Sequence, residues 1–340
     1  MLDGLDVPIV LAPLAGGPST PQLTAAVCEA GAFGFLAAGY LSPERLSGQL
    51  AELRALTVRP FGVNVFSPPA GPTDPHTYAP YVSSLQRWAA ERELPVGEPA
   101  FSDDHYAEKI DLLTQEPVAV VSFTFGAPDP DVVRRLQAVG SEVWVTVTSP
   151  EEATIAAEVR ADALVVQGVE AGGHRGSFED DVAAPAYSLM SLLQLLADAE
   201  TPLVAAGGIM SGLGIAAVLT AGARAAQLGT GFLLCPEAGT TAPHREAVLR
   251  RDAPTRLTRA FTGRTARGIL NEFMVEHDAE AVAAYPEIHY VTQPLRQAAR
   301  EAGDGSLINL WAGEGYQLAR ALSAGELTRV LAEEARLTPG

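Results

Sequence analysis

The chain has 340 residues, of which 47% are hydrophobic and 19% are charged, a balance typical of one large folded domain and not of a disordered or coiled-coil protein. The formal net charge of −18 argues against a nucleic-acid partner, which needs clustered Lys and Arg, and against docking on an anionic membrane. Only two cysteines occur, Cys28 and Cys235, and their spacing argues against a disulfide framework or a zinc site. The chain starts without a signal-peptide pattern and has no membrane-length apolar run, so we expect a cytoplasmic protein.

Short apolar runs typical of strands alternate with longer amphipathic stretches up to about residue 250. The predicted strands are Pro8–Leu11, Gly34–Ala37, Phe61–Val65, Val118–Ser122, Glu142–Val147, Ala163–Val166, Leu203–Ala206 and Ala225–Leu228. The predicted helices are Pro21–Ala30, Pro43–Leu56, Tyr78–Glu93 with Tyr106–Thr114, Asp131–Val139, Pro150–Val159, Leu189–Ala199, Gly212–Ala221 and Pro243–Arg251. Several helices open with a capping hydroxyl before proline, as at Ser42 and Ser149.

The strand-like runs are continuously apolar, which indicates a parallel sheet that helices cover on both faces. Eight such strand–helix units predict an α/β fold of the (β/α)8 or TIM-barrel type. A doubly wound open sheet is the structural rival. It would normally carry a Gly-x-Gly-x-x-Gly turn after its first strand, and residues 12–17 (APLAGG) do not fit that pattern.

The alternation stops near residue 254, so we divide the chain into a barrel at 1–254 and a C-terminal appendage at 255–340. Residues 255–269 look like paired extended segments, and helical stretches follow near 271–285, 294–302 and 315–332. We expect a smaller, mostly helical appendage packed on the barrel. The longest connection inside the barrel runs from Ser67 to Glu116, and its Pro- and Gly-rich start predicts a surface excursion.

Glycine-rich loops follow the seventh and eighth predicted strands, at residues 206–209 (AGGI) and 228–231 (LGTG). Glycine lets the backbone approach an anion, the next helix N-terminus adds a favourable dipole, and Thr230 can add a hydroxyl donor. These two loops are also where barrels of this type usually bind phosphate. The alternative is that the glycines only turn the chain, but two such loops at these positions favour a phosphate site.

The sixth loop, residues 167–176 (QGVEAGGHRG), places His174 directly after two glycines at the barrel mouth. A histidine with an ordinary pKa near ~6.5 can move a proton at neutral pH, and we favour that role over a structural one. Gln167 can hydrogen-bond the polar edge of a planar ring. Asn64 ends the third strand as an amide in an apolar run, so it either ties neighbouring strands together or binds a ligand.

The remaining polar residues carry weaker signals. Glu170 can serve as a base, although a loop carboxylate more often faces solvent or pairs with an arginine such as Arg175. His244, His277 and His289 lack the spacing typical of a metal site, and we predict no metal. Lys109 is the only lysine in the chain, which argues against Schiff-base chemistry.

Together these residues resemble the nitronate monooxygenase family, formerly called 2-nitropropane dioxygenases. The similar segments occur in order along the chain at residues 12–20, 61–64, 167–176, 206–209, 228–232, 259–264, 285–296 and 310–313. The Glu-Ala-Gly-Gly-His sequence at 170–174 in its barrel context is the most specific of them.

The resemblance implies bound FMN over the barrel mouth and a nitronate or nitroalkane that O2 oxidises to a carbonyl compound and nitrite. His174 matches the family's catalytic base, which takes the proton from the carbon alpha to the nitro group. The residues matching the family's cofactor site are Ala12, Pro13, Leu14, Asn64, Gln167, Ala171, Gly172, Gly173, Gly207, Gly208, Gln227, Gly229 and Thr230. Among them, Gly207, Gly208, Gly229 and Thr230 match the positions that hold the phosphate.

One departure and two rival functions accompany the resemblance. The family's tail often reads Trp-Ala-Gly-Gln, whereas Glu314 stands last here, and its carboxylate near the site could repel an anionic nitronate. The first rival function is an FMN-dependent NAD(P)H reductase of the quinone or enoyl-ACP type, which shares the 170–174 sequence. The second is a non-catalytic barrel that binds a flavin or another phosphorylated ligand.

Overall fold

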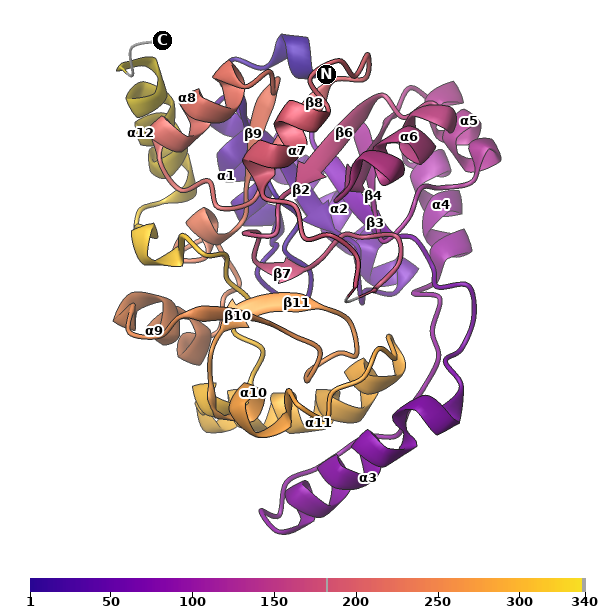
Figure 1. Cartoon of the computed structure of the whole chain (residues 1–340). Coiled ribbons are helices and arrows are strands. Elements are labelled where there is room, and N and C mark those ends of the chain that lie inside the picture. The colour runs from indigo at the N-terminus through magenta and orange to yellow at the C-terminus, as the bar shows by residue number, and fades with distance from the viewer. Residues whose placement is uncertain (182, 338–340) are drawn as a thin grey trace.

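Eight parallel strands close into a barrel in the computed structural model, which describes residues 1–181 and 183–337 (Figure 1). The barrel strands are β1 (Ile9–Leu11), β2 (Phe33–Ala37), β3 (Gly62–Phe66), β4 (Val120–Thr124), β5 (Glu142–Val147), β6 (Ala163–Gln167), β8 (Leu203–Ala206) and β9 (Ala225–Leu228). β1 pairs with both β2 and β9, so the sheet has no free edge. The predicted TIM barrel is confirmed, and the open doubly wound sheet is excluded.

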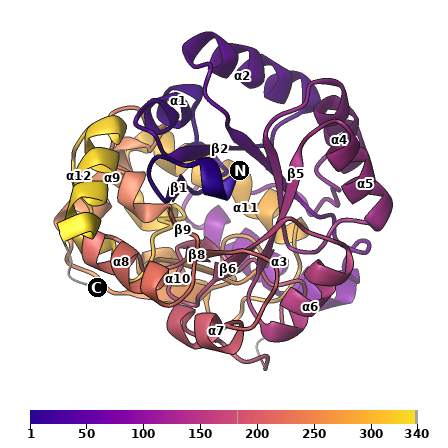
Figure 2. The ribbon, with the colours of Figure 1, turned by 90° about the horizontal axis from the view of Figure 1, so that it is seen from above.

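A ring of helices covers the barrel, as the view from above shows (Figure 2). These helices are α1 (Pro21–Glu29), α2 (Pro43–Leu56), α4 (Tyr106–Gln115), α5 (Pro130–Ala138), α6 (Pro150–Glu158), α7 (Leu189–Leu195), α8 (Gly212–Thr220) and α12 (Ala324–Leu337). The predicted start signals form as expected, because the Ser42 and Ser149 hydroxyls accept hydrogen bonds from backbone N–H groups of the first helical turn.

Helix α12 covers the barrel beside β9. We expected the helix directly after β9 to take this position. The helix after β9, α9 (Ala242–Arg250), does form, but its buried Ala247 and Val248 belong to the core of the C-terminal region. α12 instead packs against α1 and α8, with Leu327 and Leu331 in the barrel core. The chain therefore returns to the barrel after residue 254, where we placed the boundary between the two parts.

The two ends of the barrel interior differ in chemistry. At the amino-terminal end Phe33, Phe35 and Trp144 are fully buried, with ring centroids 5.2–5.7 Å apart. At the carboxyl end the strands instead contribute polar residues, which line a cavity: Asn64, Thr124, Thr146, Gln167 and Gln227. The aromatic end makes a close-packed base, and the polar end is the floor of a site.

The C-terminal region packs as a second body below the barrel in Figure 1. It contains β10 (Thr255–Thr258), β11 (Ala266–Ile269), α9, α10 (Glu272–His277), α11 (Glu287–Ala302) and the short turns η3 (Gly305–Leu307) and η4 (Tyr316–Leu318). The predicted extended segments pair as the antiparallel strands β10 and β11. α11 begins earlier than the helix that we predicted at 294, and α12 begins later than the one that we predicted at 315.

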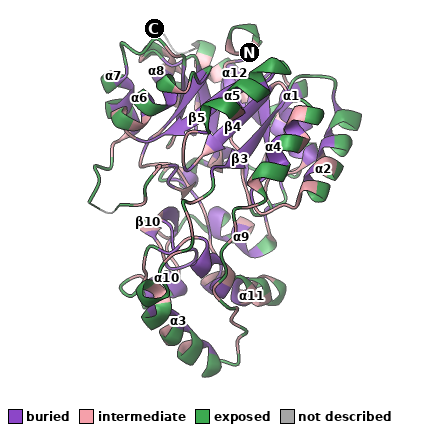
Figure 3. Cartoon of the chain, turned by 90° about the vertical axis from the view of Figure 1, so that its right-hand side faces the viewer, coloured by how far each residue is buried: buried purple, intermediate pink, exposed green. Residues whose placement is uncertain are grey.

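Helix α3 (Pro75–Ala90), from the long third connection, also joins this second body. Its Tyr81, Val82 and Leu85 are buried in the same cluster as α11, while its outer face is exposed (Figure 3). The excursion predicted after Ser67 therefore leaves the barrel and packs on the C-terminal region.

A small sheet joins the two bodies at the barrel mouth. Strand β7 is only Gly173–His174, and it pairs antiparallel with β11, with His174 opposite Ala266. Because this ladder contains His174 itself, the C-terminal region is anchored to the loop that we predicted to be catalytic. In the part of the chain that the structure describes, no helix has the length and apolar character needed to cross a bilayer.

Candidate active site

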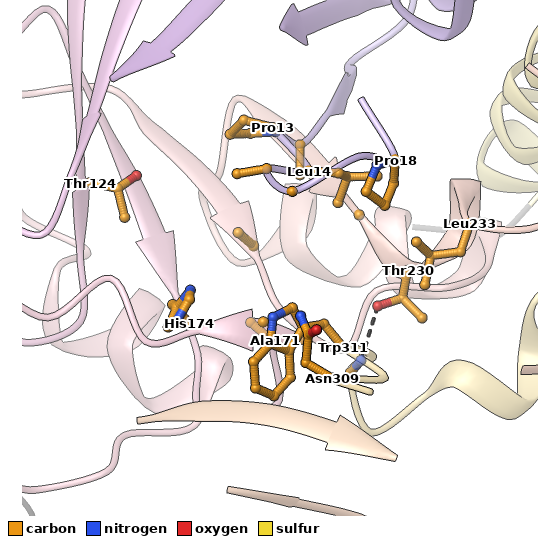
Figure 4. Close-up of a pocket in the computed structure, with 18 of the residues that line it drawn as sticks. Pro13, Leu14, Pro18, Thr124, Ala171, His174, Thr230, Leu233, Asn309 and Trp311 are labelled. Carbon is orange, nitrogen blue, oxygen red and sulfur yellow. Dashed lines mark hydrogen bonds between the residues drawn. The ribbon is translucent and has the colours of Figure 1, made fainter. Parts of the chain in front are cut away.

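A cavity of about 300 Å³ opens at the carboxyl ends of the barrel strands, between the barrel and the C-terminal region (Figure 4). It brings together every residue that we predicted to be catalytic or to bind the cofactor: Ala12, Pro13, Leu14, Asn64, Gln167, Ala171, Gly172, Gly173, His174, Gly207, Gly208, Gln227, Gly229 and Thr230. His174 and Thr230 lie on opposite sides of this cavity in Figure 4.

The side near Thr230 is built mainly from backbone. Gly207 and Gly208 have φ values of +118° and +68°, a region that favours glycine, and a Cβ on Gly208 would lie 3.2 Å from the Glu170 Cβ. The Thr230 hydroxyl accepts a hydrogen bond from the Gly313 N–H at 3.0 Å and keeps its own proton for a ligand. Gly207, Gly208, Gly229 and Thr230 thus line one cavity, and the phosphate site at the two glycine-rich loops stays a prediction.

Helix α8, which follows the seventh barrel strand β8, contributes less to the predicted phosphate site than we expected. The backbone N–H of Gly212, at the start of α8, donates to the Glu334 carboxylate at 3.0 Å, and the Ser211 hydroxyl accepts from Gly214. Because a carboxylate from α12 already occupies this N-terminus, the loop backbone and Thr230 are left as the groups that can hold a phosphate.

The two amides of the floor are engaged with the protein. The Asn64 side-chain N–H group donates to the Ser122 and Thr124 hydroxyls at 2.9 and 3.0 Å, so Asn64 ties β3 to β4 while it lines the cavity. Gln167 donates to the His174 carbonyl at 3.1 Å and accepts from the Gly176 N–H at 2.8 Å. Gln167 thus holds the loop that carries His174, and one N–H proton of its amide remains for a ligand.

His174 stands in an aromatic surround at the other side of the cavity. Its Nε2 lies 2.9 Å from the Thr262 hydroxyl, and its ring is 5.7 Å from the rings of Phe125, Tyr285 and Trp311. Burial, together with the positive charge of Arg264, lowers the pKa of His174 to about 3. The imidazole is therefore neutral at physiological pH, with a lone pair available to accept a proton.

Three cationic or titratable residues from α11 line the same side, and sequence reasoning did not single them out as site residues. Arg296 lines the cavity with its guanidinium 2.9 Å from the His289 carbonyl, and Arg300 donates to Asn309 at 2.9 Å. The His289 ring stacks on Tyr40 at 4.3 Å. No ion pair to a carboxylate is found for either arginine in the described part of the chain.

The cavity is electropositive although the whole chain is acidic. Among its described lining residues none is Asp or Glu, whereas Arg296 and Arg300 both line it. Burial and the neighbouring Arg300 lower the pKa of Arg296 to about 9, which still leaves it charged at neutral pH. A small anion inside this cavity would meet two positive charges and no repelling carboxylate.

The two acidic residues that we considered near the site point elsewhere. Glu314 pairs with Arg267 at 3.0 Å and does not line the cavity, although its neighbours Gly313 and Gly315 do. Glu170 accepts the Leu189 N–H at 3.1 Å, so its carboxylate caps the start of α7. The ion pair with Arg267 removes the expected repulsion between Glu314 and an anionic substrate, and the role of Glu170 is a helix cap.

No cluster of His, Cys, Asp or Glu suited to a metal ion occurs in residues 1–181 and 183–337. Cys28 and Cys235 are buried free thiols, and burial raises the pKa of each to about 12. Both cysteines are therefore unreactive core residues.

Comparison with known proteins shows the family of this chain. The family model for nitronate monooxygenase matches residues 2–334. The chain belongs to the nitronate monooxygenase family of oxidoreductases. It is 43% identical to a nitronate monooxygenase from Pseudomonas aeruginosa, over 98% of this chain and 97% of the relative, and 36% identical to a probable nitronate monooxygenase from Bacillus subtilis, over 97% and 96%.

Solved structures of similar proteins agree with this family. A nitroalkane oxidase from Streptomyces ansochromogenes superposes with a TM-score of 0.95 at 49% identity, covering 98% of this chain and 97% of the other. FabK from Thermotoga maritima superposes with a TM-score of 0.73 at 25% identity, covering 98% and 94%. The first likeness covers both the barrel and the C-terminal region, so the cavity between them belongs to the shared architecture.

The residues that sequence reasoning missed are Tyr40, Phe125, Thr262, Tyr285, His289, Arg296, Arg300 and Trp311. Most come from the C-terminal region, which carried no barrel signal. Two of them have a positive φ, Tyr40 at +67° and Phe125 at +79°, and each follows a barrel strand. Strained backbone of this kind is common at functional sites, but it is visible only in the structure.

Proposed function

We propose that the protein oxidises alkyl nitronates, and nitroalkanes after loss of a proton, with FMN as cofactor and O2 as oxidant, giving a carbonyl compound and nitrite. The observation that carries this proposal is the electropositive cavity with neutral His174 on one side and two phosphate-type glycine loops on the other. The names of the relatives, nitronate monooxygenase and nitroalkane oxidase, support the same substrate class.

The residues present fit FMN. Backbone at Gly208, Gly229 and Thr230 can receive the phosphate, and nothing acidic among the described lining residues opposes its charge. The floor amides, Asn64 and Gln167, lie where a flat polar ring would rest at the barrel mouth. Ala12, Pro13 and Leu14 supply apolar contact from the first loop. When bound, FMN would supply the acceptance of electrons from the substrate and their transfer to O2.

His174 and the two arginines have different roles toward the substrate. For a neutral nitroalkane, the His174 lone pair takes the proton from the carbon alpha to the nitro group: the C–H bond breaks, an N–H bond forms, and the electron pair delocalises onto the nitro oxygens. The charges of Arg296 and Arg300 stabilise the anion that forms. A nitronate enters already as this anion, so for it the arginines act as the attracting groups.

The low pKa of His174 bears on which substrate form is preferred. A base with a pKa near 3 has a weak thermodynamic pull on a carbon acid until the anion forms beside it. We therefore infer that nitronates are better substrates than the corresponding nitroalkanes.

An FMN-dependent reductase that oxidises NAD(P)H is the second candidate, and the superposition with FabK favours it. The Arg296 and Arg300 side of the cavity could also meet an anionic group of a nicotinamide cofactor. Relatives at higher identity carry the nitronate or nitroalkane names, so we place this candidate second.

A paired oxygen-uptake assay tests the proposal with purified flavin-loaded protein. The three substrates are propionate 3-nitronate, a short alkyl nitronate and NADH. We expect rapid oxygen uptake with at least one nitronate, nitrite as product, and little uptake with NADH. Uptake with NADH alone would replace the proposal with the reductase, and a colourless protein that binds no flavin would contradict both.

A further inference from the structure

Thr262 reaches the catalytic histidine from outside the barrel. It lies between β10 and β11, and β11 pairs with β7 so that Ala266 stands opposite His174. The Arg175 N–H also donates to the Thr265 carbonyl at 2.9 Å, which extends the same pairing. The backbone on both sides of the contact is thus held together, and the Thr262 hydroxyl has a defined place relative to the imidazole.

The contacts of the Thr262 hydroxyl suggest one arrangement of protons. Thr262 is buried, and its oxygen lies 2.9 Å from His174 Nε2 and 3.2 Å from the Arg264 carbonyl, and it also accepts the Arg264 N–H at 3.4 Å. A hydroxyl has one proton to donate, and a carbonyl can only accept. If Thr262 donates to the Arg264 carbonyl, then His174 Nε2 carries a proton and donates to Thr262, and both contacts are satisfied.

The other ring nitrogen then faces the cavity as an acceptor. His174 Nδ1 has no hydrogen-bond partner in the described part of the chain. It is also absent from the fully buried polar atoms without a partner, so it is accessible from the cavity. Since His174 lines the cavity, Nδ1 is the nitrogen open to a substrate. In this tautomer Nδ1 holds the lone pair that a base needs.

We propose that Thr262 is a positioning residue that fixes His174 as the Nε2–H tautomer and makes Nδ1 the atom that takes the substrate proton. The inference rests on the proposed function and adds to it the atom and the residue that orients it. Proton transfer breaks the substrate C–H bond and forms Nδ1–H, while Nε2–H still donates to Thr262. The two hydrogen bonds, Nε2–H to Thr262 and Thr262 to the Arg264 carbonyl, stabilise the resulting imidazolium, and the charge of Asp180 also favours it.

Two matched variants isolate the hydroxyl. Thr262→Val keeps the branched shape and removes the hydrogen bond, whereas Thr262→Ser keeps the hydroxyl and removes only a methyl group. Each variant is assayed as holoenzyme with nitroethane, which must lose a proton, and with preformed ethyl nitronate, which need not. The informative quantity is the ratio of the two kcat values, since a general loss of folding or flavin lowers both.

We expect Thr262→Val to lower the ratio of nitroalkane to nitronate turnover by about 10- to 100-fold, the usual effect of removing a residue that orients a catalytic histidine. Thr262→Ser should restore the ratio to within about threefold of the unaltered protein. An unchanged ratio in Thr262→Val, or a Ser variant as impaired as the Val variant, would overturn the positioning role. If the unaltered protein turns over neither substrate, the proposed function fails instead, and the two failures are thus distinguishable.

Discussion

The two sides of the cavity are built in different ways. The side near Gly208, Gly229 and Thr230 consists of loop backbone directly after β8 and β9. The side near His174 is made of side chains, and Thr262 and Arg296 reach it from the C-terminal region. In our proposal the glycine side binds the phosphate of FMN, whereas the His174 side acts on the substrate. Substitutions on the two sides should therefore separate cofactor affinity from turnover.

The largest expected separation comes from His174→Ala. Removing the imidazole should lower nitroalkane turnover by ~100-fold or more, because a positioned base contributes about that much. FMN affinity should stay close to that of the unaltered protein, since the glycine loops are untouched. Steady-state kinetics and a flavin fluorescence titration measure the two effects on one preparation. Unchanged turnover with FMN still bound would show that His174 is not the base.

A carboxylate on the glycine side of the cavity should instead weaken FMN binding. We expect Gly208→Asp to weaken FMN binding by ~100-fold, because a carboxylate in the glycine loop that we propose for the phosphate would repel its charge. Gly208→Asn is the matched control, since Asn has the same shape and also tolerates the positive φ at this position. A fluorescence titration of the apoprotein with FMN gives both affinities. Equal losses in the two variants would mean that the backbone strain, and not the phosphate, explains the effect.

Arg300 offers a smaller effect on the His174 side. Arg300→Gln should raise the KM for ethyl nitronate about 5- to 10-fold, because one of two positive charges near the anion is lost. The KM for neutral nitroethane should change much less, and Arg300→Lys should retain most of the affinity. An equal rise in KM for both substrates in Arg300→Gln would point to a change in cavity shape instead of charge.

An effect of another kind concerns stability in mild acid. Burial lowers the pKa of His174 to about 3 and that of His244 to about 4, while the unfolded chain has histidines near ~6.5. Above pH 6.5 both histidines are neutral in the folded and in the unfolded state, so they do not change the folding stability with pH. Below it the unfolded state gains protons that the folded state does not, so folding stability should fall by roughly 1 kcal/mol per pH unit for each histidine.

Thermal melting between pH 6.5 and 5 measures this loss before most carboxylates titrate. We expect Tm to fall steadily over that window. His244→Gln, which keeps a donor for the Trp311 carbonyl, should show a shallower fall because one titrating group is gone. A Tm that is flat over this range would contradict the buried neutral state of these rings.

The same comparison explains how far the sequence could predict the molecule. The barrel strands and the glycine loops follow from local patterns, since apolar runs and consecutive glycines have a physical meaning within a few residues. Thr262 and Arg296 have no such signal, because Thr262 contacts His174 from a distant part of the chain and Arg296 lines a cavity whose other residues come largely from the barrel. Pairing of His174 with Ala266 brings those segments together. No local sequence pattern predicts that strand pairing.

Other differences have the same origin. The sequence left open whether Glu314 repels an anionic nitronate, but its carboxylate pairs with Arg267, which lies far from it in sequence. α12 covers the barrel in place of α9 because its apolar face meets α1 and α8, which only the tertiary fold reveals. The N-terminus of α8 is likewise occupied by Glu334 from α12.

The central claim is that electrons enter this protein from a nitronate at the His174 side and not from a nicotinamide. Anaerobic rapid mixing of the flavin-loaded protein with ethyl nitronate, and separately with NADH, tests it without oxygen chemistry. We predict that the nitronate bleaches the oxidised-flavin absorption bands within a turnover time, while NADH leaves them unchanged over the same period. Rapid bleaching by NADH with no change on adding the nitronate would contradict the account.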